Sequence, residues 1–158
     1  MQIFHEDGRT FLNRAEEKYD VIYGDTYKSL YTIPWHLTTL EASLKCYEML
    51  HDGGCILINI ISAIQGEGSL FLQAEFSTYR AVFPEVFVFA VDNPENLTDL
   101  QSIMLVAVKT SVPLKKTDVD PELSLFLTHD VTDKVGRNVP VLTDEKAPVD
   151  YYMNRVIR

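Results

Sequence analysis

This chain has few glycines, and it lacks an early glycine-rich loop of the kind found in nucleotide-binding domains. Only seven glycines occur among the 158 residues, and the closest groupings, Gly53-Gly54 and Gly66-x-Gly68, come late. A Gly-x-Gly-x-x-Gly fingerprint belongs between a first strand and a first helix, where glycines let the backbone approach a phosphate. Because that loop is lacking, we expect the chain to correspond to a later part of a cofactor-binding fold.

Cysteine, positive charge and long apolar runs are also in short supply. Cys46 and Cys55 are too few for a disulfide framework, and both are expected as reduced core residues of a cytoplasmic protein. The formal net charge of −9 disfavours nucleic acid as a partner, since phosphate binding needs a basic face. The longest apolar run, residues 55–64, is too short to span a membrane, and no signal peptide is visible.

Metal and nucleophile motifs are missing as well. The four histidines are scattered, and none stands at a metal-ligand spacing from another ligand. No serine or cysteine lies in a nucleophile motif. We therefore expect no metal cofactor and no covalent catalysis by these side chains.

Strands and helices are expected to alternate along a single domain of ordinary globular composition, with 46% hydrophobic and 23% charged residues. Such alternation predicts an α/β fold with a mostly parallel sheet. The polar stretch 92–101 is too short for a crossover helix, so the last two strands are expected to be antiparallel. We expect strands at 1–6, 19–24, 55–61, 86–91 and 103–108, and helices at 9–17, 38–50, 70–83, 123–129 and 149–158.

Three helix ends carry recognisable signals. Thr38 and Glu41 have capping-box spacing, with Thr38 as the N-cap. Gly53 follows the same helix as a C-cap residue. Pro148 introduces the last helix at its first turn. The apolar run 55–61 is interrupted only by Asn59 and is typical of a central parallel strand buried on both faces.

Several segments, taken in order, resemble the spermidine synthase family (polyamine aminopropyltransferases). The resemblance covers nearly the whole chain, and the order and spacing of the segments make it more specific than any one of them. The segments are residues 7–12, 19–25, 36–39, 52–57, 65–67 with 83–84, and 142–149.

The resemblance implies a Rossmann-like, class I methyltransferase-type fold. It implies a donor cofactor, either decarboxylated S-adenosylmethionine or S-adenosylmethionine, and an amine acceptor. Residues 1–158 would form a single, N-terminally incomplete domain that lacks the family's first βαβ portion. Homodimers are common among such families, and the strand at 19–24 would be left with an open edge.

Asp7 and Gly8 are the candidate cofactor-binding residues. The resemblance implies that this pair meets the adenine of the donor. A carboxylate at a strand end can accept a hydrogen bond from an exocyclic amine, and such ends are where α/β sheets bind ligands. Aspartate is equally a good helix N-cap, so Asp7 could serve as the cap, as the ligand contact, or as both.

Asp25 is the candidate catalytic residue. By resemblance it orients or deprotonates the attacking amine, a role for which a carboxylate is suited. A turn residue at a strand end is the alternative interpretation. Lys28 stands where the family has a second acidic residue, and its charge disfavours a diamine such as putrescine.

Gln65, Glu67 and Tyr27 are the candidate substrate-binding residues. The first two lie in a loop that, by resemblance, contributes to the amine pocket; a polar loop built on a glycine turn is the alternative. Tyr27 belongs to an aromatic cluster with Tyr31, Trp35 and His36, which could wall a ligand pocket, cover the sheet or form an interface.

Two functions remain open at this point. The first is a transferase using an S-adenosylmethionine-type donor, impaired or inactive as this chain alone because the loop that holds the donor is lacking. The second is a non-catalytic oligomerisation or ligand-sensing module.

Overall fold

The computed structural model describes residues 2–25, 33–114 and 120–155. In chain order its helices and strands are α1 (Gly8–Arg14), β1 (Tyr19–Gly24), α2 (Leu40–Met49), β2 (Leu50–Ser62), α3 (Leu70–Arg80), β3 (Glu85–Ala90), β4 (Gln101–Val108), α4 (Pro121–Leu127) and α5 (Val149–Met153). Three short 3₁₀ turns lie between them: η1 (Trp35–Leu37), η2 (Glu67–Ser69) and η3 (Thr132–Lys134). None of the described helices is both long enough and apolar enough to cross a bilayer.

The four strands form one sheet in the order β1-β2-β4-β3. Strands β1 and β2 are parallel, whereas β4 is antiparallel to both of its neighbours, β2 and β3. Three strands therefore point one way and β4 runs between two of them in the opposite direction. This confirms the expected α/β class and the antiparallel pairing of the last two strands.

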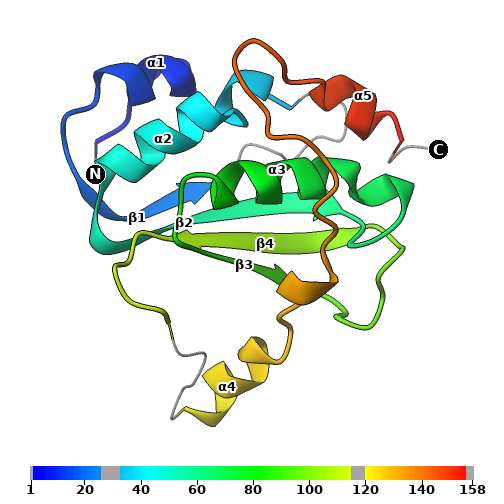
Figure 1. Cartoon of the computed structure of the whole chain (residues 1–158). Coiled ribbons are helices and arrows are strands. Elements are labelled where there is room, and N and C mark those ends of the chain that lie inside the picture. The colour runs from blue at the N-terminus through cyan, green and yellow to red at the C-terminus, as the bar shows by residue number, and fades with distance from the viewer. Residues whose placement is uncertain (1, 26–32, 115–119, 156–158) are drawn as a thin grey trace.

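The helical layer covers one face of the sheet. Helices α1, α2, α3 and α5 lie on the same side of it (Figure 1). On that side Ile56, Ile58 and Ile60 of β2 are buried, whereas the residues that alternate with them are only partly buried. The position of this strand inside the sheet is as predicted, but its burial on both faces is not. Both faces of β2 are apolar, and the helices cover only one of them.

The expected strand at 1–6 is wrong, since residues 2–6 form no strand. Ile3 and Phe4 are 65% and 50% exposed, and Phe4 packs on Phe11 of α1 with ring centroids 5.2 Å apart. A strand requires a neighbour to satisfy its backbone groups, whatever its local propensity. The following helix is shorter than expected, because Ala15 takes an extended conformation with φ −68° and ψ 131°.

The start and end of α2 also differ from the expectation. The N-cap is Thr39, whose hydroxyl accepts from the Ala42 N–H at 3.3 Å, and not Thr38. Glu41 accepts from the Asp144 N–H at 2.9 Å instead of closing a capping box. Gly53 does not end the helix, because the chain passes directly from α2 into β2 and Gly53 lies within that strand at φ 85°.

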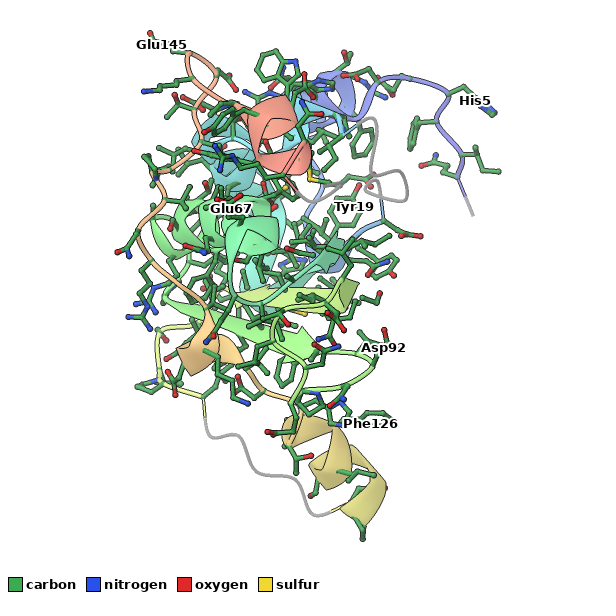
Figure 2. The ribbon with its side chains drawn as sticks, turned by 90° about the vertical axis from the view of Figure 1, so that its right-hand side faces the viewer. His5, Tyr19, Glu67, Asp92, Phe126 and Glu145 are labelled. Atoms are coloured by element: carbon green, nitrogen blue, oxygen red, sulfur yellow. The ribbon has the colours of Figure 1, made fainter. Side chains whose placement is uncertain are left out.

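The segment around Leu142 closes the helical layer over the sheet. The Leu40 N–H donates to the Leu142 carbonyl at 2.8 Å, and the Leu142 N–H donates to the Thr78 hydroxyl at 3.0 Å. Leu142 thereby joins α2 to α3. The last helix, α5, begins after Pro148 as predicted. Helix α4 lies away from this layer, and Figure 2 shows its Phe126 at the opposite end of the view from Glu145.

Candidate functional site

The carboxyl ends of β1 and β2 form the edge of the sheet at which a ligand is expected. Asp25 directly follows β1, and Gln65 and Glu67 follow β2. Gly24 pairs with Ile58 in the register of the two strands, so β2 runs on past the end of β1 to Ser62. Asp25 consequently lies beside the last part of β2 and not level with the loop that follows it.

Asp25 lies within hydrogen-bond reach of the side chain of Asn59. The Asn59 amide donates to Asp25 Oδ1 at 3.4 Å, and the Asn59 carbonyl oxygen accepts from the Ser102 hydroxyl at 3.0 Å. These two contacts use the opposite ends of one amide and so fix its orientation. A partly buried carboxylate positioned in this way can accept hydrogen bonds from a cationic amine.

Asp7 is the N-cap of α1. Its Oδ1 accepts from the N–H groups of Arg9 and Thr10 at 2.9 and 3.0 Å, and its Oδ2 lies 3.0 Å from His36 Nε2. The hydrogen bond from Thr10 and the pairing with His36 hold the pKa of Asp7 below its usual value. The capping alternative is therefore confirmed. The side chain remains 52% exposed, which leaves it accessible to a ligand.

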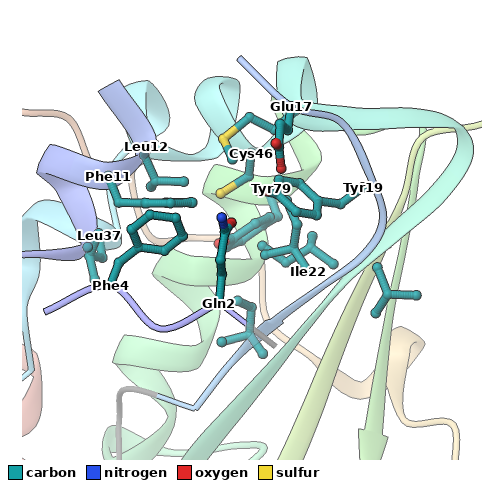
Figure 3. Close-up of a pocket in the computed structure, with 16 residues that line it drawn as sticks. Gln2, Phe4, Phe11, Leu12, Glu17, Tyr19, Ile22, Leu37, Cys46 and Tyr79 are labelled. Atoms are coloured by element: carbon teal, nitrogen blue, oxygen red, sulfur yellow. The ribbon is translucent and has the colours of Figure 1, made fainter. Parts of the chain in front are cut away.

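Gly8 allows α1 to approach η1 closely. A Cβ at Gly8 would lie 3.2 Å from Leu37 Cδ1, so a larger residue would require the Leu37 side chain to shift. Gly8 also lines a cavity of about 550 Å³ between α1 and the sheet. Figure 3 shows Phe11 and Leu12 on one side of this space, with Tyr19 and Ile22 of β1 on the other. The lining is mostly apolar, which suits the face of a ring or an aliphatic group.

Gln65 and Glu67 contact the C-terminal part of the chain. The Gln65 amide donates to the Lys134 carbonyl at 3.2 Å, and Glu67 forms an ion pair with Arg155 at 3.1 Å. Both residues are exposed. The other two candidates have different partners: Asp7 contacts His36 of η1, and Asp25 contacts Asn59 of β2. Tyr27, the remaining candidate, lies outside the residues that the structure describes.

Arg9 joins three of the segments that the sequence singles out. Its guanidinium pairs with Asp144 at 2.6 Å and donates to the His36 carbonyl at 3.1 Å. Asp144 also accepts from the Thr39 hydroxyl at 2.6 Å. The segments around residues 7–12, 36–39 and 142–149 therefore meet at one polar cluster at the start of α1 and α2.

Neither cysteine is suited to act as a catalytic nucleophile. Burial raises the pKa of Cys46 to about 12 and also raises the pKa of Cys55. A thiolate is the reactive form, so neither is activated as a nucleophile. Across residues 2–25, 33–114 and 120–155, no three histidine, cysteine, aspartate or glutamate side chains are grouped so as to hold a metal ion.

Two features of the site were missed by reasoning from the sequence. Asn59 was read only as an interruption of an apolar strand, although a lone amide in such a run is itself a signal of a polar contact. His36 had no partner that could be read from the sequence, because Asp7 lies 29 positions away. Both contacts depend on tertiary structure.

The strand order, with β4 running opposite to both of its neighbours, is that of part of a class I methyltransferase-type α/β fold. No family model matches the chain. In sequence the chain is similar to a probable polyamine aminopropyl transferase from Bifidobacterium longum (strain NCC 2705), with 33% identity over 164 residues that cover 91% of this chain and 36% of the relative.

Solved structures agree with this likeness. A probable spermidine synthase from Corynebacterium glutamicum ATCC 13032 matches with a TM-score of 0.60 and 21% identity, covering 94% of this chain and 50% of that one. The spermidine synthase from Thermotoga maritima matches with a TM-score of 0.52 and 18% identity, covering 98% of this chain and 48% of that one.

The predicted resemblance is therefore confirmed: the chain is spermidine synthase-like and resembles the C-terminal part of those proteins. It spans about a third of the length of the curated relative and about half the length of the two solved ones.

Proposed function

We propose that this chain carries the acceptor side and the adenine end of a transferase site that uses an S-adenosylmethionine-type donor. The observation that carries the proposal is the partly buried carboxylate of Asp25 at the carboxyl end of β1, which accepts a hydrogen bond from Asn59. In the proposed reaction an amine attacks the carbon next to the donor's sulfonium. Asp25 orients the amine and accepts the proton that it loses.

The cavity beside Gly8 fits the adenosyl end of either S-adenosylmethionine or its decarboxylated form. Its apolar lining can take the ring, and the exposed carboxylate of Asp7 stands at the same end of α1. When bound, the donor would supply the electrophilic carbon. Tyr27, Gln65 and Glu67 are proposed to contribute to the amine pocket, and the protein is proposed to be cytoplasmic.

The chain alone is proposed to be impaired or inactive, since the sequence lacks a glycine-rich loop for the rest of the donor. Isothermal titration with S-adenosylmethionine, its decarboxylated form and methylthioadenosine tests this. We expect weak binding or none. A dissociation constant at or below about 10 μM, roughly −7 kcal/mol, would be too tight for a half site.

A second candidate function is a non-catalytic oligomerisation or ligand-sensing module. The contacts of Gln65 and Glu67 favour the non-catalytic role. Both side chains bind the C-terminal segment, so they stabilise the fold and are not free to line an amine pocket. In this case too the chain by itself is proposed to form a homodimer, through the open edge of β1.

A further inference from the structure

The C-terminal segment directs one cationic side chain onto the loop that follows β2. Val149 and Met153 of α5 are buried and fix this helix to the rest of the protein. Arg155, which comes just after the helix, reaches Glu67 of η2, and its Nη1 lies 3.1 Å from Glu67 Oε1. Figure 2 shows Glu67 next to α5. The ion pair therefore joins the C-terminal segment to one of the candidate substrate-binding residues.

Tyr151 of α5 contacts the same guanidinium. Nη2 of Arg155 donates to the Tyr151 hydroxyl at 2.8 Å, and Cζ of Arg155 lies 5.0 Å from the centroid of the Tyr151 ring. A carboxylate, a hydroxyl oxygen and an aromatic ring thus bind one cation. Proteins recognise guanidinium and ammonium groups with these partners, and the use of two different nitrogens matches the planar fork of a guanidinium.

This arrangement allows exchange with a free cation. The side chain of Glu67 is 75% exposed, against 37% for Arg155, so a ligand can contact the carboxylate before the guanidinium leaves. Ion pairs between side chains this exposed contribute little to stability. Arg155 is tethered beside Glu67, however, so it competes at an effective concentration on the order of millimolar.

We infer that Glu67 and Tyr151 form a recognition site for small organic cations that carry a guanidinium group, and that Arg155 occupies this site as an internal competitor. The consequence for the acceptor rests on the proposed function, in which Glu67 contributes to the amine pocket. There a cationic acceptor binds the carboxylate only by displacing Arg155. The contact between Glu67 and the C-terminal segment is then reversible, and it lowers the affinity of the pocket for its ligand.

Arg155→Ala empties the site and keeps the residues that anchor α5. Ethylguanidinium, which has the shape of the missing side-chain end, is titrated into the full chain without donor or amine, and amide chemical shifts are followed by NMR. We expect saturable shifts around Glu67 and Tyr151, with a dissociation constant at least about fivefold lower than in the wild type. Ethylammonium should bind more weakly, because it lacks two donor nitrogens in one plane.

Further variants test the partners of the bound cation. Glu67→Gln, added to Arg155→Ala, should remove the gain in affinity, and Tyr151→Phe should reduce it by about twofold or more. The matched control is Lys45→Ala, which also removes one positive charge and frees the exposed carboxylate of Glu48 from an ion pair. This control should leave the affinity for ethylguanidinium as in the wild type.

Three outcomes would overturn the inference: no saturable shifts around Glu67, an equal gain in Lys45→Ala, or a gain that survives Glu67→Gln. If Arg155→Ala alters the fold, Arg155→Gln, which keeps most of the side chain, is titrated in its place and judged in the same way. Failure of the proposed function has a different result. Ethylguanidinium would still bind the variant, whereas in a reconstituted active domain the KM for the amine would be the same with and without Arg155.

Discussion

Oδ2 of Asp7 lies 3.0 Å from Nε2 of His36, while Oδ1 of the same carboxylate caps α1. One side chain thus fixes the start of a helix and joins it to η1. Any adenine that Asp7 contacts would share the carboxylate with His36, so ligand binding and the position of η1 are linked. This relationship gives Asp7 a measurable structural role that is separate from any ligand.

The first prediction concerns the stability supplied by Asp7. Asp7→Ala should lower the thermal midpoint, and Asp7→Asn should lower it less because asparagine also caps helices. The folded pKa of Asp7 is lowered, so its stabilisation is present above the unfolded value of 3.8 and is lost as the pH falls through the folded pKa. Thermal melts of the three proteins from neutral to acid pH test this; equal midpoints at neutral pH would contradict it.

The second prediction concerns Glu75 in the middle of α3. It is fully buried, and neither carboxyl oxygen has a hydrogen-bond partner within the described part of the chain. Burial raises its pKa well above 4.5. The folded protein therefore favours the protonated form of Glu75. The contribution of Glu75 to the free energy of unfolding is fully present below pH 4.5 and is lost as the pH rises through the raised pKa.

Substitutions of Glu75 separate these effects. Glu75→Gln should flatten the pH dependence of the free energy of unfolding, and Glu75→Met should raise that free energy by about 1–3 kcal/mol by removing a buried unpaired polar group. Urea titrations at several pH values measure both. The exposed Glu48→Gln should leave the slope as in the wild type, and an equal change in both glutamine variants would refute the assignment.

The third prediction separates the roles of Asp25 and Asp7 in a reconstituted active domain. Asp25→Asn should reduce turnover far more than it weakens donor binding, because the carboxylate acts on the acceptor. Asp7→Ala should do the reverse, since Asp7 is assigned to the adenine. Steady-state kinetics together with donor titration test this, and finding the two effects exchanged would sink the assignment of roles.

The fourth prediction is that the chain on its own forms a homodimer. The edge of β1 and its exposed side chains at Val21 and Tyr23 can pair with the same edge of a second copy. Light scattering at several protein concentrations measures this. A monodisperse mass near 18.0 kDa that persists at high concentration would contradict it.

The sequence predicts those elements whose signals are local. The apolar run of β2, the polar stretch before β4 and Pro148 before α5 each led to an element that the structure contains. The N-cap of α2 was placed one residue too early because Thr38 and Thr39 are chemically equivalent, and Asp144, which lies far along the chain, decides which of them is used.

Elements that depend on a neighbour could not be predicted in this way. The strand expected at 1–6 has suitable residues but lacks a pairing partner in the described chain. The partners of Gln65 and Glu67 come from segments about 70 to 90 positions further on, which local patterns do not reveal. The place of Asp25, Gln65 and Glu67 at this edge of the sheet was thus predictable from the sequence, whereas their contacts were not.

The place of Leu142 has a consequence for the order in which the protein folds. Its backbone bonds reach Leu40 and Thr78, so α2 and α3 acquire this shared hydrogen-bond partner only after the chain has been synthesised as far as Leu142. Contacts of such long sequence separation are slow to form, because the intervening chain must first be ordered. The sheet and α3 can therefore assemble before Leu142 is made, whereas the contact that joins α2 to α3 through Leu142 forms later.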